Sequence, residues 1–144
     1  VFNPESNINQ SFVPDIRLHS IEPGQALALF GRDWVPLRLM HGQLPILGYR
    51  LGRFAYCTDV SVVPEETLGL LAGLDLLVLG ALRHRPHPTH LTVVQALAVV
   101  ERLRPARTVL THIAHDLAHA DLERDLPARV RPGYDGLTLE VADG

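Results

Sequence analysis

The sequence predicts a single α/β domain, because its patterning changes once along the chain. In the first half, short apolar segments alternate with glycine turns, which is typical of an antiparallel meander. From Pro64 onward, helical periodicity alternates with short apolar strands, which indicates helix–strand units. At 144 residues and 47% hydrophobic residues, the chain is long and apolar enough for one core. We therefore expect residues 1–144 to form one domain.

The first half predicts strands joined by tight turns. Residues 1–16 are polar and carry prolines and asparagines, so we expect a loop-rich N-terminal segment there. The strands that we expect next are 17–21, 26–30, 34–40, 45–51 and 54–58. Gly52-Arg53 lies between the last two of these and predicts a tight hairpin.

The second half predicts helices that alternate with buried strands. Pro64 suits the first position of a helix and Gly73 suits its end. Residues 74–79 form a nearly continuous apolar run, which is typical of a strand buried on both faces. Thr92-x-x-Gln95 is a capping box that opens a helix to Leu103. The remaining elements that we expect are a strand at 108–110, a helix at 120–126 and a strand at 137–141.

Composition and charge exclude several classes of protein. The formal net charge is −3 and no block of Lys or Arg occurs, so a nucleic-acid partner and a membrane-surface patch are not expected. The single Cys57 excludes an intrachain disulfide and a thiolate metal cluster. The apolar run 70–82 is interrupted and too short to span a bilayer. No secretion signal opens the chain, which begins at Val1, so we expect a cytoplasmic protein and a chain cut from something longer.

Three predicted strands end in residues that bind metals. Met40 leads into His41, Thr58 into Asp59, and Leu110-Thr111 into His112. Each alone is more often a capping or turn residue. Together, two imidazoles and a carboxylate suit zinc, manganese or iron, and a carboxylate can bridge two metals. The shared position at strand ends therefore predicts a metal site.

A second group of histidines lies in the loop before the capped helix. For His84 and His87 we prefer a solvated, proline-stiffened loop. His90 differs, because it directly precedes a helix N-terminus, whose backbone donors favour anions. A phosphate bound there would meet an imidazole that can give or take a proton.

Four motifs carry a resemblance to a known family. They are CTDV at 57–60, HPTHLTVVQAL at 87–97, LTHIAHD at 110–116 and YDG at 134–136. In this order and spacing, over Trp34 to Val141, the chain resembles a branch of the metallo-β-lactamase superfamily. That branch contains the phosphodiesterase of the carbon–phosphorus lyase pathway and its relatives.

The resemblance implies a four-layered αββα sandwich with two divalent metal ions, of zinc or manganese, at one edge. It implies that His41 binds the first metal, that Asp59 bridges both, and that His112 binds the second. It implies that His90 assists the leaving group. It also implies that His115 joins N-terminal cysteines around a separate structural zinc, although a surface role for His115 stays open.

The chain departs from the family pattern in two ways. It contains no H-x-H-x-D-H motif and no cysteine-rich segment, so it resembles the C-terminal half of the enzyme. Gly80 stands where relatives carry an acidic residue, which leaves a contact beneath the histidine loop in doubt.

These observations lead to three functional hypotheses. The first is a dinuclear phosphodiesterase acting on small cyclic phosphodiesters, in which a metal-activated hydroxide attacks phosphorus and His90 protonates the departing alkoxide. The second is a catalytically silent half-domain that forms a homodimer or pairs with the missing N-terminal half through exposed apolar strands. The third is a tRNA-processing relative, against which the acidic balance argues. Because one scaffold serves several chemistries, the substrate and the metal stay open.

Overall fold

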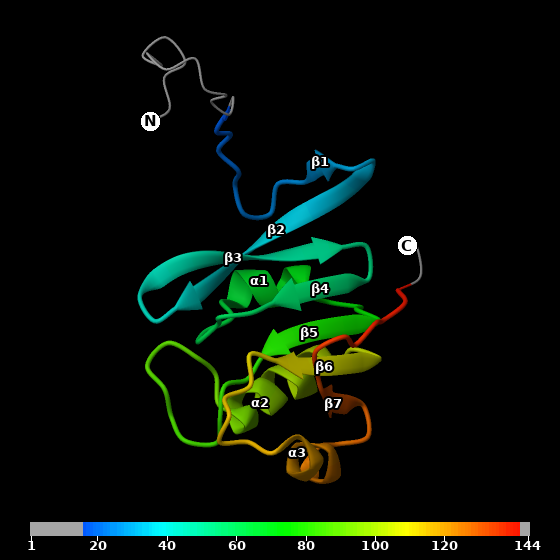
Figure 1. The fold of residues 1–144 in the computed structure, drawn as a ribbon. Helices are drawn as coiled ribbons and strands as arrows, with labels where there is room; N and C mark the ends of the chain where they lie inside the picture. Colours follow the sequence, from blue (N-terminus) through cyan, green and yellow to red (C-terminus); the bar gives the residue numbers. More distant parts are fainter. Residues whose placement is uncertain (1–15, 142–144) are drawn as a thin grey trace, which may run out of the picture.

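A seven-stranded mixed sheet organises the chain (Figure 1). The computed structural model describes residues 16–141. The strands follow one another across the sheet in chain order, from β1 to β7. Their bounds are β1 Leu27–Leu29, β2 Arg32–His41, β3 Leu44–Leu51, β4 Phe54–Cys57, β5 Leu76–Gly80, β6 Arg107–Thr111 and β7 Val130–Pro132. The helices are α1 Glu65–Leu70, α2 Val93–Leu103 and α3 His119–Asp125.

Strand directions bring several strand ends to one edge of the sheet. Strands β2, β3 and β4 pair antiparallel, whereas β4, β5, β6 and β7 pair parallel. Strands β2, β4, β5 and β6 therefore run the same way, and Figure 1 shows the arrowheads of β4, β5 and β6 on the same side. This follows from the connections, since tight turns join antiparallel strands and helices carry the chain back between parallel ones.

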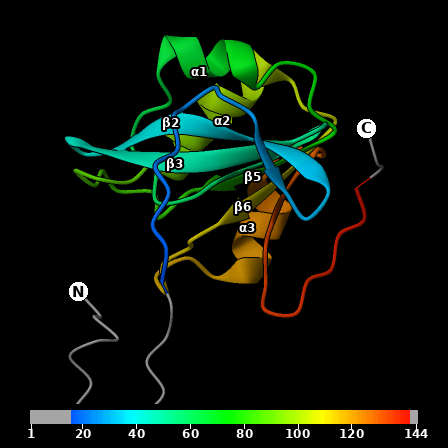
Figure 2. The same ribbon diagram turned by 90° about the horizontal axis from the view of Figure 1, so that it is seen from above.

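The two faces of the sheet are covered differently. The main core lies between the sheet and the helices, and Figure 2 shows α1 and α2 on one side of the sheet and the C-terminal segment on the other. Leu37, Leu77 and Leu110 on the helix side are completely buried. We call the opposite side the helix-free face; it carries Phe54, Leu76, Val78 and Val109, against which the segment 137–141 packs.

The local signals for α2 act as predicted. The Thr92 hydroxyl accepts a hydrogen bond from the Gln95 backbone N–H at 3.2 Å. The Gln95 side chain in turn accepts from the Thr92 backbone N–H at 2.8 Å. At the other end, Arg104 adopts a left-handed conformation with φ of 47° and Pro105 follows it. The capping box and the stop fix where α2 begins and ends.

The structure confirms most predicted elements and corrects three. Residues 17–21 form no strand, and the first predicted helix spans only Glu65–Leu70. Residues 137–141 alternate as a strand does, yet they are unpaired and pack their apolar side chains on the helix-free face. The last strand is β7 instead, a short edge strand that ends in Pro132. The predicted loop at 1–16 lies almost wholly outside the described residues.

None of the described helices is long and apolar enough to cross a membrane.

Burial of the single thiol gives a direct test of the core. Cys57 ends β4 on the helix side, is 0% exposed, and its burial raises its pKa to about 12 from an ordinary value of 9.0. We expect a thiol reagent at pH 8 to label Cys57 only as fast as the protein unfolds. Between pH 9 and pH 12 the unfolded chain loses the proton that the folded chain keeps, so stability falls as pH rises.

The test measures labelling rates of native and urea-unfolded protein in parallel. Native labelling at the unfolded rate would contradict a closed core around β4.

Candidate metal centre

The predicted site residues lie at the shared edge of the sheet. His41 is the last residue of β2, Asp59 follows β4 by two residues, and His112 directly follows β6. His90 belongs to the segment that leads from β5 to α2. Ligand sites of α/β sheets form outside the carboxyl ends of strands, and these four residues occupy that position.

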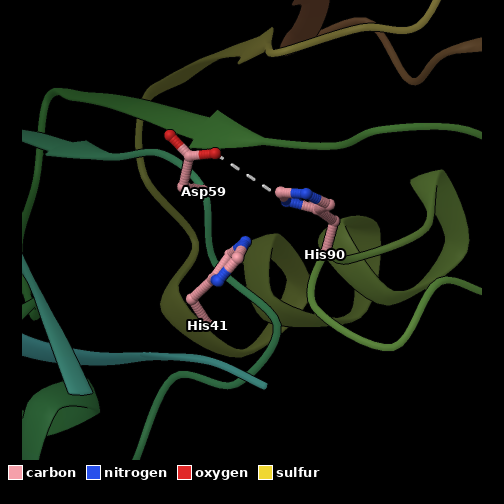
Figure 3. A group of neighbouring side chains, drawn as sticks. All are labelled: His41, Asp59 and His90. Carbon is pink, nitrogen blue, oxygen red and sulfur yellow. Dashed lines mark ion pairs between the residues drawn. The ribbon is translucent and has the colours of Figure 1, made fainter. Parts of the chain in front are cut away.

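The side chains converge to within a few ångströms. Ligand atoms of His41, Asp59 and His90 all lie within 4.8 Å of one another. Figure 3 shows the three side chains pointing toward a common centre. Asp59 Oδ1 lies 3.2 Å from His112 Nε2 and 4.0 Å from His90 Nδ1. The ring centroid of His90 is 4.8 Å from that of His41 and 4.8 Å from that of His112. Residues that are 71 positions apart in the sequence, between His41 and His112, therefore share one site.

Two of these residues have a strained backbone. Asp59 has a φ of 54° and His112 a φ of 59°, in the left-handed region that residues with a side chain rarely adopt. Such a conformation costs on the order of 1–3 kcal/mol, persists only where the surrounding structure imposes it, and clusters at functional sites. Within the described residues, only Phe30 and Arg104 are other non-glycine residues with positive φ. The strain thus falls on two of the predicted metal ligands.

His90 is held as a neutral imidazole. Its Nδ1 is buried and has no hydrogen-bond partner among the described residues. Burial lowers its pKa first, the neighbouring imidazoles of His112, His87 and His41 lower it further, and Asp59 partly raises it. A neutral imidazole is the form that binds a metal or accepts a proton.

The donor set fits a divalent metal. Zinc binds imidazole nitrogen and carboxylate oxygen at about 2.0–2.2 Å, so two ligands of one ion lie roughly 3–4 Å apart. The Asp59–His112 separation of 3.2 Å and the Asp59–His90 separation of 4.0 Å match that spacing. Imidazole with carboxylate suits zinc, manganese or iron. The geometry brings His90 as close to Asp59 as a ligand would be, although the sequence predicts proton transfer for it.

Other histidines of the prediction lie apart from this group. His115 is exposed on the turn after β6 and lies outside the cluster of His41, Asp59 and His90. Its role at a structural zinc stays a prediction. The neighbouring Asp116 pairs instead with Arg85 at 3.6 Å. His84 is exposed, as the solvated-loop interpretation predicts.

For His87 the solvated-loop prediction is wrong. Its side chain is half-buried, and its ring centroid lies 4.8 Å from that of His90. The only sequence signal that could have found it is its place three residues before His90, within HPTH.

Gly80 lies directly beneath the Asp59 turn. It ends β5 and is buried, and a Cβ added to it would lie 3.3 Å from the Asp59 backbone nitrogen and 3.4 Å from the Thr58 Cα. The end of β5 therefore contacts the backbone that carries Asp59. The family resemblance predicts an acidic residue at this position. In this chain the position is glycine, and the backbone of Thr58 and Asp59 packs closely against it.

Comparison with known proteins identifies the family. The family described as "Beta-lactamase superfamily domain" matches residues 2–113. The chain belongs to this superfamily. Among solved structures, a diphosphatase from the PhnP family is 43% identical with a TM-score of 0.84, over 88% of this chain and 49% of that one. The metallo-β-lactamase fold predicted from the sequence is thereby confirmed, as is the relation to the predicted branch.

A more distant solved structure shares the fold, and one curated protein is similar in sequence. The human short-form tRNase Z matches with a TM-score of 0.62 and 20% identity, over 81% of this chain and 46% of that one. An octanoyltransferase of Porphyromonas gingivalis (strain ATCC BAA-308 / W83) is 36% identical over 129 residues, 86% of this chain but 26% of that protein. The chain spans about half the length of these solved structures and about a quarter of this curated relative.

Gly80→Ala tests the contact beneath Asp59. Because the new methyl group would meet the Asp59 nitrogen at 3.3 Å, the turn must shift by a few tenths of an ångström. Disturbing the support of a ligand costs about 10- to 100-fold in metal affinity, and we expect a loss of about tenfold for zinc. Competition with a chromophoric chelator measures it.

Gly69→Ala is the matched control, since Gly69 lies in α1 with no atom within 4 Å of an added Cβ. It should leave zinc affinity unchanged. An unchanged affinity in Gly80→Ala would show that the turn does not depend on the glycine.

Proposed function

We propose that this chain carries one part of the active site of a metal-dependent phosphodiesterase that acts on small, cyclic phosphodiesters. The observation that carries the proposal is the convergence of His41, Asp59 and His112 beside His90 at one edge of the sheet. The similarity to a diphosphatase of the PhnP family supports phosphoester chemistry. A protein with this set would bind two divalent ions, of zinc or manganese.

The residues divide into holding and proton-transfer roles. His41, Asp59 and His112 would hold the metals: Asp59 Oδ1 lies 3.2 Å from His112 Nε2, His41 belongs to the same cluster, and a carboxylate can serve two ions. When bound, divalent ions at such a site supply an activated water and stabilise the charge that develops on phosphorus. Asp59 supplies the only carboxylate in the cluster of His41, Asp59 and His90.

His90 would transfer a proton to the leaving group. Its ring lies 4.8 Å from both His41 and His112, next to where a phosphate on the metals would sit. Burial lowers the pKa of His90, so its neutral ring would first take up a proton, from the attacking water or from solvent, and would then give that proton readily to the departing alkoxide. An alkoxide leaves poorly without such a proton.

Acyl transfer or hydrolysis is the second candidate. It is favoured by the 36% identity to an octanoyltransferase, although the match covers only 26% of that protein. The same metals and imidazoles could act on an ester or thioester carbonyl, because the scaffold does not fix the chemistry.

We also propose that the helix-free face packs against a second sheet. Segment 137–141 already covers Leu76, Val78 and Val109 of this face, whereas Tyr56 on β4 is 42% exposed beside it. A diphosphatase of the PhnP family is about twice as long as the matched region, which leaves room for the other half of an αββα sandwich. The partner would be that half, or a second copy of the chain. Size-exclusion chromatography of the 144-residue chain, alone and mixed with the other half, tests this, and a stable monomer in both cases would contradict both.

Asp59→Ala tests the proposed activity in the full-length protein. With zinc or manganese supplied, we expect the wild type to hydrolyse bis-p-nitrophenyl phosphate and the variant to lose at least about 100-fold in kcat, because the bridging carboxylate is removed. The control Asp33→Ala changes an exposed carboxylate at the opposite end of β2 from His41 and should leave activity unchanged.

The same proteins are assayed with p-nitrophenyl octanoate. Full diesterase activity in Asp59→Ala would exclude the bridging role. Activity on the octanoate ester alone would replace the phosphodiesterase assignment with the acyl one.

A further inference from the structure

The loop that carries His87 and His90 is an ordered segment. The Arg83 guanidinium donates hydrogen bonds to the carbonyls of Arg85, at 3.3 Å, and Pro86, at 3.1 Å. At the far end, the Leu91 backbone N–H donates to the Val60 carbonyl at 2.7 Å. The loop is therefore tied internally and to the strand-end turn that follows Asp59.

Within this loop, His87 is fixed through Nδ1. The Thr89 backbone N–H donates to His87 Nδ1 at 3.4 Å, and the Thr89 hydroxyl lies 3.2 Å from the same nitrogen. A backbone N–H can only donate, so Nδ1 is the unprotonated nitrogen and the proton of a neutral ring lies on Nε2. Thr89 also packs beside the residue after His41, since its Cγ2 would lie 3.1 Å from a Cβ on Gly42. The imidazole of His87 is thus anchored to the site by its own loop.

His87 completes a ring of imidazoles around His90. Its centroid lies 4.8 Å from that of His90, with 32° between the planes. The rings of His41 and His112 lie at the same distance, at 69° and 42°. His87 differs from those two because it follows no strand end and its Nδ1 accepts from Thr89, whereas His41 lies in one cluster with Asp59 and His112 Nε2 lies 3.2 Å from Asp59 Oδ1.

The orientation of His90 depends on such packing. Its buried Nδ1 has no hydrogen-bond partner in the described part of the chain, so no bond at that nitrogen fixes the rotation of the ring. The ring torsion of histidine is broad and roughly two-fold, so packing must select one orientation. His41 and His112 would bind the metals. Of the three rings around His90, His87 is therefore the one that would act on His90 by packing alone.

We propose that His87 is a positioning residue, whose ring, anchored by Thr89, holds His90 in the orientation that proton transfer requires. The inference rests on the proposed function for the role of His90. In this role His87 would act on His90 without binding a metal itself.

The variants His87→Ala, His87→Phe and His84→Ala separate packing from other roles. His87→Ala should lower kcat on a 2′,3′-cyclic nucleotide, whose leaving group is an alkoxide, by about 10- to 100-fold, because a small misplacement of a catalytic group has a cost of that order. On bis-p-nitrophenyl phosphate, whose phenolate leaves without a proton, kcat should change much less. The KM and the bound metal of His87→Ala should stay unchanged. His87→Phe keeps an aromatic ring and should recover to within about threefold of the wild type. His84→Ala, exposed in the same loop, should match the wild type.

Imidazole NMR gives a readout that needs no activity. In the metal-loaded protein, the His90 ring signal, assigned by its loss in His90→Gln, should move and broaden in His87→Ala and stay in place in His87→Phe. If the wild type hydrolyses no diester, the proposed function fails, and the NMR comparison alone decides the positioning role.

Three results would overturn the inference. One is a His87→Ala variant with wild-type kcat on the cyclic nucleotide. Another is a His87→Phe variant as slow as His87→Ala with a raised KM, which would make His87 a substrate contact through its N–H. The third is a His90 signal that is identical in the wild type and His87→Ala.

Discussion

The candidate site depends on the common direction of β2, β4, β5 and β6. Hydrogen-bonded register fixes where each strand stops, and His41, Asp59 and His112 lie at the end of a strand or within two residues after it. A slip of one residue between two strands would turn the side chains of a strand to the other face and move its end away from the others. The buried pairing of β5 with β4 and β6 therefore holds the chemistry in place as well as the core.

Sequence was sufficient where the signal is local. The capping box at Thr92, the glycine turns and the buried run of β5 each specify their own geometry within a few residues. The apolar runs and the glycine turns indicated where the strands that lead to His41, Asp59 and His112 end, and therefore which residues lie close together. Sequence was insufficient where two outcomes share one pattern. Alternation at Leu137 and Leu139 suits a paired strand and an extended segment packed on a sheet face equally well.

Other features depend on contacts across the fold. β7 is three residues long and ends in proline, so its pairing with β6 follows from the adjacent sheet edge and from little in its own sequence. His87 is half-buried, and its ring is fixed by a hydrogen bond from Thr89 in the same loop. Nothing in a run of His, Arg and Pro specifies that contact. The left-handed backbone of Asp59 and His112 is likewise invisible in residue type, because neither is glycine.

The electrostatic character of the site follows from its composition. Its imidazoles surround one carboxylate, that of Asp59, whose side chain is 48% exposed, and burial lowers the pKa of His90. Several carboxylates in one place would repel one another when no ion is present, whereas a single half-exposed carboxylate has no such neighbour. The fold can therefore form this edge of the sheet without prior charge compensation.

The backbone at Asp59 and His112 has a consequence for evolution. Because glycine adopts that conformation without strain, and asparagine, aspartate and histidine adopt it more often than other residues, few substitutions preserve the backbone at either position. A lineage that lost its cation could retain asparagine or glycine there and keep the turn, while valine or isoleucine would disturb the turn itself. Inactive descendants of this architecture should therefore be recognisable by small or amide side chains at these two places, with the strands around them intact.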